Sequence, residues 1–423
     1  MPSDQHDESA DELLTAADPL DAARRHIIDG ALRESPGGDA ARVGLELEFH
    51  LVDLAEPARR PSWEQVQQLA GGLPPMPSGS SVTVEPGGQL ELSTPPEVGV
   101  AASVAALLAD RRVLQDGLAA AGFGSAPLGT DPARPVQRIN PSARYVAMEE
   151  HFAALNCARS GKAMMSATAA LQVNLDAGPR ERWTDRLGRI RALGPVLVAV
   201  SACSTLLAGE ASGWHSMRQE AWHGIDHSRS DPVRGVEPGA AWASYALDAP
   251  VMLVRDGERV TPVRQRVPFR AWLRGASPID RRPTTSDLDY HLTTLFPPVR
   301  PRGYVEIRCL DALPDRWWPA LAALTVALVE DDIASDRAAE LCEPLRDAWV
   351  TAARDGLKDP AVHRAAFGCV EVATRRCAPE LKAGVEALAE LVADGRTPGD
   401  ELRERARRSD PITVLAEEAR AGV

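Results

Sequence analysis

Polar residues recur at a spacing of two in three short stretches of the chain, and each stretch contains glutamate. The stretches are residues 44–49 (GLELEF), 85–93 (EPGGQLELS) and 304–308 (YVEIR). Alternate side chains of a β-strand point to the same face. The pairs that would share a face are Glu46 with Glu48, Gln89 with Glu91, and Glu306 with Arg308. Any single stretch would fit a solvated strand face. Because clustered carboxylates repel one another, the three together predict divalent cations held by oxygen ligands.

The composition predicts a soluble globular protein with a large core. The chain has 423 residues, 44% of them hydrophobic, and a formal net charge of -13. This charge opposes binding to nucleic acid or to an anionic membrane. The acidic N-terminus lacks the pattern of a signal peptide, and the longest apolar run, residues 195–209, is shorter than the about 20 residues that span a bilayer. We therefore expect a cytoplasmic protein with neither nucleic acid nor membrane as a partner.

The hydrophobic pattern predicts an α+β fold with an antiparallel sheet, because helices and strands do not alternate as in βαβ units. Residues 1–20 are expected to be a disordered acidic tail, and residues 21–423 a single catalytic domain that is mainly helical from about residue 315. Helices are expected within residues 98–121, 141–158, 180–209 and 288–295, and strands within 82–93, 167–176 and 304–309. Residues 218–283, rich in Arg, Pro and Gly, are expected to form long loops over a site.

Several further motifs accompany the glutamate stretches. They are Met164-Met165 followed by Thr168 and by Gln172-Val-Asn-Leu-Asp176; Arg218 with Trp222 and Asp226; His291-Leu-Thr-Thr-Leu-Phe-Pro297; and Glu306-x-Arg308-x-x-Asp311. Together with Glu46-x-Glu48 and the specific segment at 85–93, they make residues 43–332 resemble the glutamate-cysteine ligases of the plant and proteobacterial type. Within that family the chain is most similar to the actinobacterial enzymes of ergothioneine synthesis. The resemblance implies a glutamine synthetase-like fold, with a curved antiparallel sheet forming a funnel flanked by helices.

The resemblance also implies an activity that depends on ATP and Mg²⁺. ATP would phosphorylate the γ-carboxylate of L-glutamate, and the amine of L-cysteine would attack the resulting γ-glutamyl phosphate. On the family pattern the metal ligands are Glu46, Glu48, Glu85, Glu91 and Glu306. Arg308, with Glu306, is assigned to catalysis, since a guanidinium fork can contact two phosphoryl oxygens. Substrate binding is assigned to Arg144, Arg218, Trp222, Thr168, Met165 and Gln172, and cofactor binding to Gln89 and Asn174.

Other interpretations of these residues stay open. The default role of an arginine is a surface ion pair, and Trp222 and Met165 would serve equally as core residues. His291 fits a structural brace as well as a catalytic role, and the histidines at 215, 223 and 227 lack the pattern of a zinc site. A glycosidase would need only two carboxylates. The chain could also be another carboxylate-amine ligase or a nucleotide-binding regulator without turnover.

Two departures from the family pattern concern the second substrate. Leu288-Asp-Tyr290 stands where plant-like members tend to have Trp-Glu-Asn, and Cys309-Leu310 replaces small residues. These changes leave the cysteine-binding residues unassigned. The sequence makes no prediction of the oligomeric state.

Overall fold

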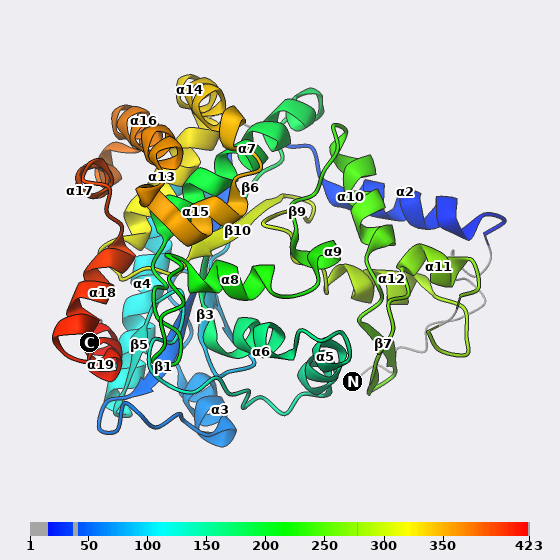
Figure 1. The fold of residues 1–423 in the computed structure, drawn as a ribbon, viewed down its shortest axis with the longest axis horizontal. Coiled ribbons are helices and arrows are strands. Elements are labelled where there is room, and N and C mark those ends of the chain that lie inside the picture. The colour runs from blue at the N-terminus through cyan, green and yellow to red at the C-terminus, as the bar shows by residue number, and fades with distance from the viewer. Residues whose placement is uncertain (1–15, 37–40, 277, 422–423) are drawn as a thin grey trace.

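The computed structural model describes residues 16–36, 41–276 and 278–421, which are built around an eight-stranded sheet (Figure 1). Six strands form the path β2 (Ser81–Val84), β3 (Leu90–Ser93), β1 (Arg42–Asp53), β6 (Ala170–Leu175), β10 (Val305–Asp311) and β9 (Val299–Pro301). β4 (Glu97–Val98) and β5 (Phe123–Ala126) also pair with β1. All of these pairings are antiparallel, so the predicted α+β fold is confirmed.

Helices cover the hydrophobic face of this sheet. α4 (Gly99–Ala120) contacts β1, α7 (Trp183–Ser201) contacts β10, and α13 (Trp318–Glu330) contacts β6. Leu45, Leu47 and Phe49 are fully buried, whereas the intervening Glu46 and Glu48 are partly exposed, as the period of a strand requires. The helix expected over residues 98–121 is confirmed, since α4 spans nearly the same residues.

The chain after residue 315 is helical. Beyond α13 it forms α14 (Asp332–Cys342), α15 (Trp349–Asp355), α16 (Pro360–Arg376), α17 (Lys382–Ala393), α18 (Pro398–Arg408) and α19 (Pro411–Arg420). These helices lie at one end of the molecule, and α19 contacts β5 (Figure 1). That residues 21–423 act as one catalytic domain stays a prediction.

A second group of elements extends beside the sheet, at the opposite end from α17 to α19 (Figure 1). It contains α2 (Pro19–Ala31), α10 (Pro238–Asp248), α11 (Phe269–Leu273), α12 (Thr285–Leu292) and the hairpin of β7 (Leu253–Asp256) and β8 (Arg259–Pro262). α2 begins within the predicted tail, of which residues 1–15 lie outside the described part of the chain.

Two sequence predictions fail in this second group. The expected long loops over residues 218–283 are wrong where α10 forms, because Glu237 caps the helix and Pro238 occupies its first turn. The helix expected to begin at residue 288 begins earlier, since Thr284 and Asp287 form a capping box. Proline, which we interpreted as a loop signal, here occupies the first turn of a helix.

Three helices lie on the polar side of the sheet, and one strand of the sheet is irregular. The helices are α5 (Ala143–Ala154), α6 (Ala158–Ala167) and α8 (Met217–His223). Of the neighbouring short helices, α3 (Trp63–Gly72) contacts β2 and α9 (His227–Ser230) contacts α8 and α10. The pairing of β10 with β6 shifts between Ile307 and Leu310, so that Arg308 and Cys309 together oppose Gln172. Such a β-bulge bends its strand and redirects a side chain.

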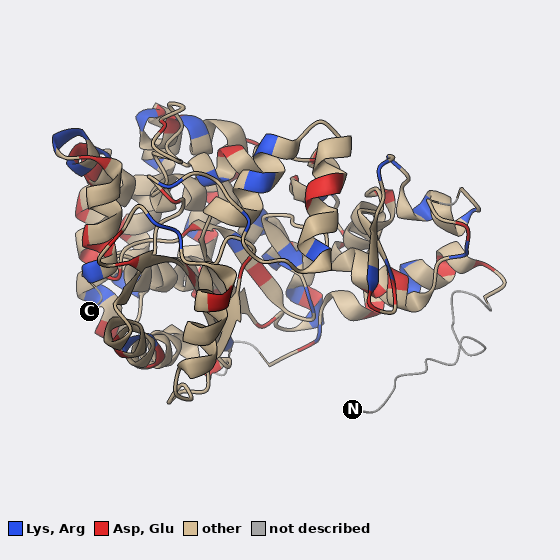
Figure 2. Cartoon of the chain, turned by 90° about the horizontal axis from the view of Figure 1, so that it is seen from below, with Lys and Arg blue, Asp and Glu red and all other residues tan. Residues whose placement is uncertain are grey.

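Acidic and basic residues are intermixed along the ribbon rather than separated by sign (Figure 2). Many arginines are paired at the surface, such as Arg376 with Asp331 at 2.7 Å and Arg405 with Glu417 at 2.6 Å. This is the default role that we expected for an arginine. None of the helices in the described ranges combines the length and apolar character needed to cross a bilayer.

Candidate active site

The polar face of the sheet and helices α5, α6 and α8 enclose a pocket of about 940 Å³, open solvent included. The predicted site residues in its lining are Glu46, Glu48, Glu85, Gln89, Glu91, Arg144, Met165, Thr168, Gln172, Arg218, Trp222, Glu306 and Arg308. Asn174 lies next to this lining, where its Nδ2 donates a hydrogen bond to Glu46 Oε1 at 2.8 Å. The fold thus brings together residues that are far apart in sequence, while their roles stay predictions.

Strand pairing sets the order of the polar side chains across the sheet. The directly opposed pairs are Glu48 with Glu91, Glu46 with Gln172, and Glu306 with Asn174. Opposed residues of antiparallel strands have Cβ atoms roughly 4.5–5.5 Å apart, so these side chains are neighbours. Glu48 also accepts hydrogen bonds from the backbone N–H of Ala170 at 3.0 Å and from Gln172 Nε2 at 3.4 Å.

The loop that carries Glu85 depends on two glycines. Gly88 has a φ of 84°, which disfavours any residue with a side chain. A Cβ on Gly87 would lie 2.1 Å from the carbonyl oxygen of Ser166, at the end of α6. The buried Gln89 donates from Nε2 to the carbonyl oxygen of Thr168, directly after α6, at 2.8 Å. The loop is therefore locked against α6, and this contact fixes the position of Glu85.

Three glutamates of the pocket are in surroundings that disfavour their charge. Burial, followed by repulsion from Glu91 and Glu306, raises the pKa of Glu46 to about 7. Burial and Glu91 likewise raise the pKa of Glu85 to about 7. Loss of water around the carboxylate, followed by repulsion from Glu85 and Glu91, holds the pKa of Glu48 well above its usual range. Either protons or a nearby cation would relieve this repulsion.

The donor atoms around these carboxylates fit magnesium. The amide oxygens of Gln89, Gln172 and Asn174 are buried without a hydrogen-bond partner in the described part of the chain. Over residues 16–36, 41–276 and 278–421, no three His, Cys, Asp or Glu side chains are already gathered around one metal position. Mg²⁺ usually binds through one or two carboxylates and completes its shell with water and substrate phosphates. The pocket therefore suits ions that enter together with a nucleotide.

Glu306 differs from the other glutamates because arginines contact both of its oxygens. Arg300 donates from Nε at 2.7 Å and from Nη2 at 3.0 Å, and Arg308 Nη1 donates at 3.1 Å. Although burial opposes it, the charges of Arg300 and Arg308 lower the pKa of Glu306 to about 2. A metal ion could bind Glu306 only if one arginine released an oxygen. The predicted ligand role of Glu306 thus competes with its ion pairs.

Two arginines and two aromatic rings form one wall of the pocket. The guanidinium carbon of Arg308 lies 5.7 Å from the ring centroid of Trp222 and 5.8 Å from that of Phe296. These two rings meet edge to face at 5.4 Å. Arg218 is only 3% exposed, and its Nη2 donates to the carbonyl oxygen of Arg308 at 2.8 Å. A surface ion pair is therefore excluded as the role of Arg218.

Arg144 connects the pocket to the segment that departs from the family pattern. Its Nη2 donates to the carbonyl oxygen of Thr293 at 3.1 Å, and its guanidinium carbon lies 4.9 Å from the ring centroid of Tyr290. Arg255 lies on the same ring at 5.1 Å. Tyr290 thus links the β7–β8 hairpin to a side chain of the pocket.

Comparison with known proteins gives a match along nearly the whole chain. The model of the family described as glutamate-cysteine ligase family 2 (GCS2) matches residues 42–420. The chain belongs to this family.

Curated relatives of this family member share most of their length with it. The glutamate-cysteine ligase EgtA of Mycolicibacterium smegmatis is 49% identical over 387 residues, which is 90% of each chain. The protein of the same name from Mycobacterium tuberculosis is 48% identical over 390 residues, 91% of this chain and 90% of its own. Among solved structures, the glutamate-cysteine ligase of Francisella tularensis in complex with AMP covers 92% of this chain and 89% of its own, with a TM-score of 0.60 and 14% identity. That structure shares the fold.

Part of the pocket lining of this family member had no role assigned from the sequence. The further lining residues are Pro86, Tyr145, Met148, Met164, Phe296, Arg300 and Arg302. Arg300 and Arg302 lie two apart in and after β9, a spacing that could have revealed them. His291 is structural: its Nε2 lies 2.8 Å from the carbonyl oxygen of Ala246 and its pKa is lowered to about 3 by burial.

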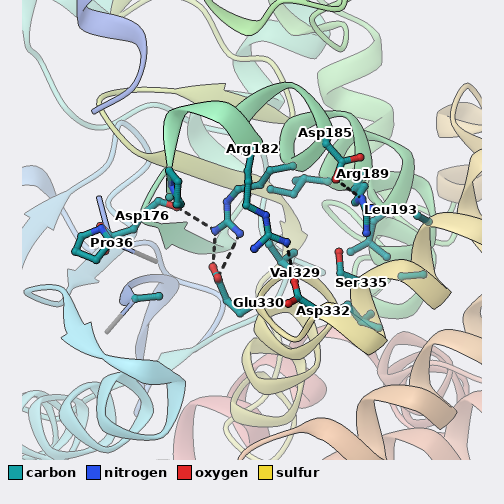
Figure 3. Close-up of a pocket in the computed structure, with 18 residues that line it drawn as sticks. Pro36, Asp176, Arg182, Asp185, Arg189, Leu193, Val329, Glu330, Asp332 and Ser335 are labelled. Carbon is teal, nitrogen blue, oxygen red and sulfur yellow. Dashed lines mark hydrogen bonds and ion pairs between the residues drawn. The ribbon is translucent and has the colours of Figure 1, made fainter. Parts of the chain in front are cut away.

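A second pocket of the same protein, between α7 and α14, holds none of the predicted site residues (Figure 3). Its arginines already contact carboxylates of the protein. Arg182 lies 2.7 Å from Asp332, and Arg186 pairs with Glu330. Because none of the predicted site residues lies here, the pocket on the sheet is the better candidate for the active site.

Proposed function

We propose that the protein is an ATP- and Mg²⁺-dependent ligase that joins the γ-carboxylate of L-glutamate to the amine of L-cysteine. The product, γ-glutamylcysteine, would enter the synthesis of ergothioneine or a related thiol. The observation that carries this proposal is a single pocket that combines clustered carboxylates, whose pKa values are raised, with buried arginines. The first group suits metal ions, and the second suits anionic substrates.

The reaction consists of two transfers. The γ-phosphoryl group of ATP passes to a γ-carboxylate oxygen of glutamate, and ADP leaves. The amine of cysteine then attacks the acyl carbon of γ-glutamyl phosphate, so that a C–N bond forms, phosphate leaves and the nitrogen loses a proton. Both transfers move negative charge, and stabilising this charge is the main task of the pocket.

The carboxylates of Glu46, Glu48, Glu85 and Glu91 are proposed to hold the magnesium ions. The amide oxygens of Gln89, Gln172 and Asn174 supply neutral acceptors beside them, and their lack of other partners supports this role. Bound Mg²⁺ would neutralise phosphate charge during the transfer. Glu306 is proposed as a further ligand only if it gives up one of its arginine contacts.

Arg308 is proposed to contact the phosphoryl group as it transfers. Glu306 and Arg300 support this assignment, because their ion pair holds one side of Arg308 while two rings pack against it. A guanidinium held in this way loses little freedom when it binds a phosphate oxygen. Glu306 therefore contributes to catalysis through the position of Arg308.

Glutamate is proposed to bind through its α-carboxylate to Arg218 and Arg144. The guanidinium of Arg218 keeps Nε and Nη1 free of hydrogen bonds within the described residues, so it has donors to offer. Trp222, Thr168 and Met165 would line the side of this substrate. Correct placement of the γ-carboxylate alone can lower a barrier by roughly 7 to 11 kcal/mol.

The test is release of phosphate from ATP in the presence of Mg²⁺ and L-glutamate. L-cysteine is compared with a panel of other amino acids and amines, and the mass of each product is recorded. Release that requires cysteine, with the mass of γ-glutamylcysteine, is the expected result. Release with a different amine would retain glutamate activation and change the acceptor, which is the alternative favoured by Tyr290 beside Arg144. Retained ATP binding without release for any acceptor would indicate a regulator.

A further inference from the structure

A buried carboxylate at the end of β10 lies behind the wall of the pocket. Asp311 is 1% exposed and does not line the pocket. Its Oδ2 accepts hydrogen bonds from the hydroxyl of Ser204 at 2.6 Å and from the N–H of Cys203 at 2.9 Å, and its Oδ1 accepts from the hydroxyl of Ser216 at 2.9 Å. A Cβ on Gly129 would lie 2.7 Å from Asp311 Cγ, so the backbone also closes tightly around this group.

The two serines connect Asp311 to the first turn of α8. Ser216 is the N-cap of this helix, and its hydroxyl oxygen accepts from the N–H of Gln219 at 3.1 Å. The hydroxyl oxygen of Ser204 accepts from the N–H of Arg218 at 3.1 Å. Each hydroxyl therefore donates to Asp311 and accepts from the helix, which fixes the helix start relative to β10.

The side chains of the same helix turn return to β10 at its bulge. Arg218 Nη2 donates to the carbonyl oxygen of Arg308, and Gln219 Nε2 donates to that of Cys309, both at 2.8 Å. These two carbonyls belong to the bulged residues, which fall between the paired positions of the sheet. A bulge left without such partners would be free to change the direction of its side chains.

Asp311, the two serines, the start of α8 and the bulge thus form a closed circuit of hydrogen bonds. We propose that Asp311, Ser216 and Gln219 are positioning residues that hold Arg218 and Arg308 as one unit. The inference rests on the proposed function, because it takes these arginines as the contacts of glutamate and of the transferring phosphoryl group. It adds that glutamate binding and phosphoryl transfer depend together on residues that touch neither substrate.

The test compares variants of the full chain that break the circuit away from the pocket. Ser216→Ala removes a helix cap and a bond to Asp311, Gln219→Met keeps the size of the side chain but not its donor, and Asp311→Asn keeps the shape without the charge. Asp410→Ala is the matched control, because Asp410 caps the distant α19 through the N–H of Thr413. Phosphate release is measured against glutamate and against ATP, and stability is measured by urea unfolding.

Ser216→Ala and Gln219→Met are expected to lower kcat/KM for glutamate by about 10- to 100-fold, because a small misplacement of reacting groups has an effect of that size. The KM for ATP should change less than about threefold, since the carboxylate side of the pocket is untouched. Asp410→Ala should keep both constants within about twofold despite a comparable loss of stability. Asp311→Asn should have an effect of the same size, and values of kcat/KM within threefold of wild type in all three circuit variants would overturn the inference.

The failure of the proposed function would be seen separately, as absence of phosphate release by the wild-type protein. In that case a crystal structure of Gln219→Met decides the inference. A displaced Arg308 side chain would support it, and an Arg308 side chain in its wild-type position would overturn it.

Discussion

Replacing Arg308 with alanine should separate turnover from nucleotide binding. The side chain is proposed to contact the phosphoryl group during its transfer. Removing one such preorganised donor reduces transition-state stabilisation by roughly 2.7 to 4 kcal/mol, which lowers kcat by about 100- to 1000-fold. The ground-state contacts of ATP with metal ions held by Glu46, Glu48, Glu85 and Glu91 would persist. We therefore expect ATP affinity, measured by calorimetry with Mg²⁺, to stay within about tenfold of wild type.

The fold should survive this change. Glu306 keeps both hydrogen bonds from Arg300, so no buried carboxylate is left alone. The lost contacts with Trp222 and Phe296 are worth about 0.5 to 1 kcal/mol each, so the free energy of unfolding should fall by about 1 to 2 kcal/mol.

Arg302 provides the control for charge alone. It lies 3.6 Å from the same carboxylate, but its side chain is 59% exposed, so water screens its contribution. Arg302→Ala is expected to lower kcat less than about fivefold. The reasoning is refuted if Arg308→Ala weakens ATP binding as much as it lowers turnover, because Arg308 would then be a ground-state ligand, or if Arg302→Ala has the same effect.

Three further predictions concern the carboxylate side of the pocket. Gly87→Ala should lower turnover by about 10- to 100-fold, because the new Cβ would collide with a backbone carbonyl and displace Glu85. Gly188→Ala is the control: this position in α7 has open space around it, so the change should stabilise the protein by up to about 1 kcal/mol. Enzyme kinetics and urea unfolding distinguish the two variants. Mg²⁺ should raise the melting temperature more at pH 8 than at pH 6. Glu46 and Glu85 have pKa values of about 7, so they are largely deprotonated and repel each other only at the higher pH, whereas protons compete with the metal at the lower pH. An equal shift at both pH values in differential scanning fluorimetry would contradict the metal assignment. Glu48→Gln should raise the Mg²⁺ concentration that half-saturates phosphate release by about tenfold or more. Glu306→Gln should raise that concentration less than about threefold and should mainly lower kcat. Equal shifts in the two variants would mean that Glu306 is a metal ligand.

Local spacing was sufficient to predict which side chains share a face. Glu46 and Glu48 face the pocket while Leu45 and Leu47 face the core, because the alternation of a strand depends on neighbouring residues alone. Which strands become neighbours is a property of the whole chain. The opposition of Glu48 and Glu91 follows from the register of β1 with β3, which no local pattern contains.

The parts that the sequence did not predict involve long-range pairing. Arg300 binds Glu306 only because β9 pairs with β10. Pro301 is tolerated in β9 because this strand lies at the end of the strand path. The assignment of Asn174 to the cofactor stays a prediction, and the contact of its amide with Glu46 was not foreseen. In both cases the residue type was informative, but its partner was set by the fold.

The bulge in β10 also determines on which side of the strand Asp311 lies. Ile307 and Leu310 both pair with core-facing residues of β6, so the one extra residue returns Asp311 to the same side as Glu306. If the same residues paired without a bulge, Leu310 would face the polar pocket and Asp311 the hydrophobic core, where an unpaired carboxylate is very costly. Deleting Cys309 would instead remove the bulge and leave both residues on their present sides. The extra residue therefore serves the direction of Arg308 and the two carbonyl groups that α8 contacts, and a redesign that shortened the strand would disturb these first.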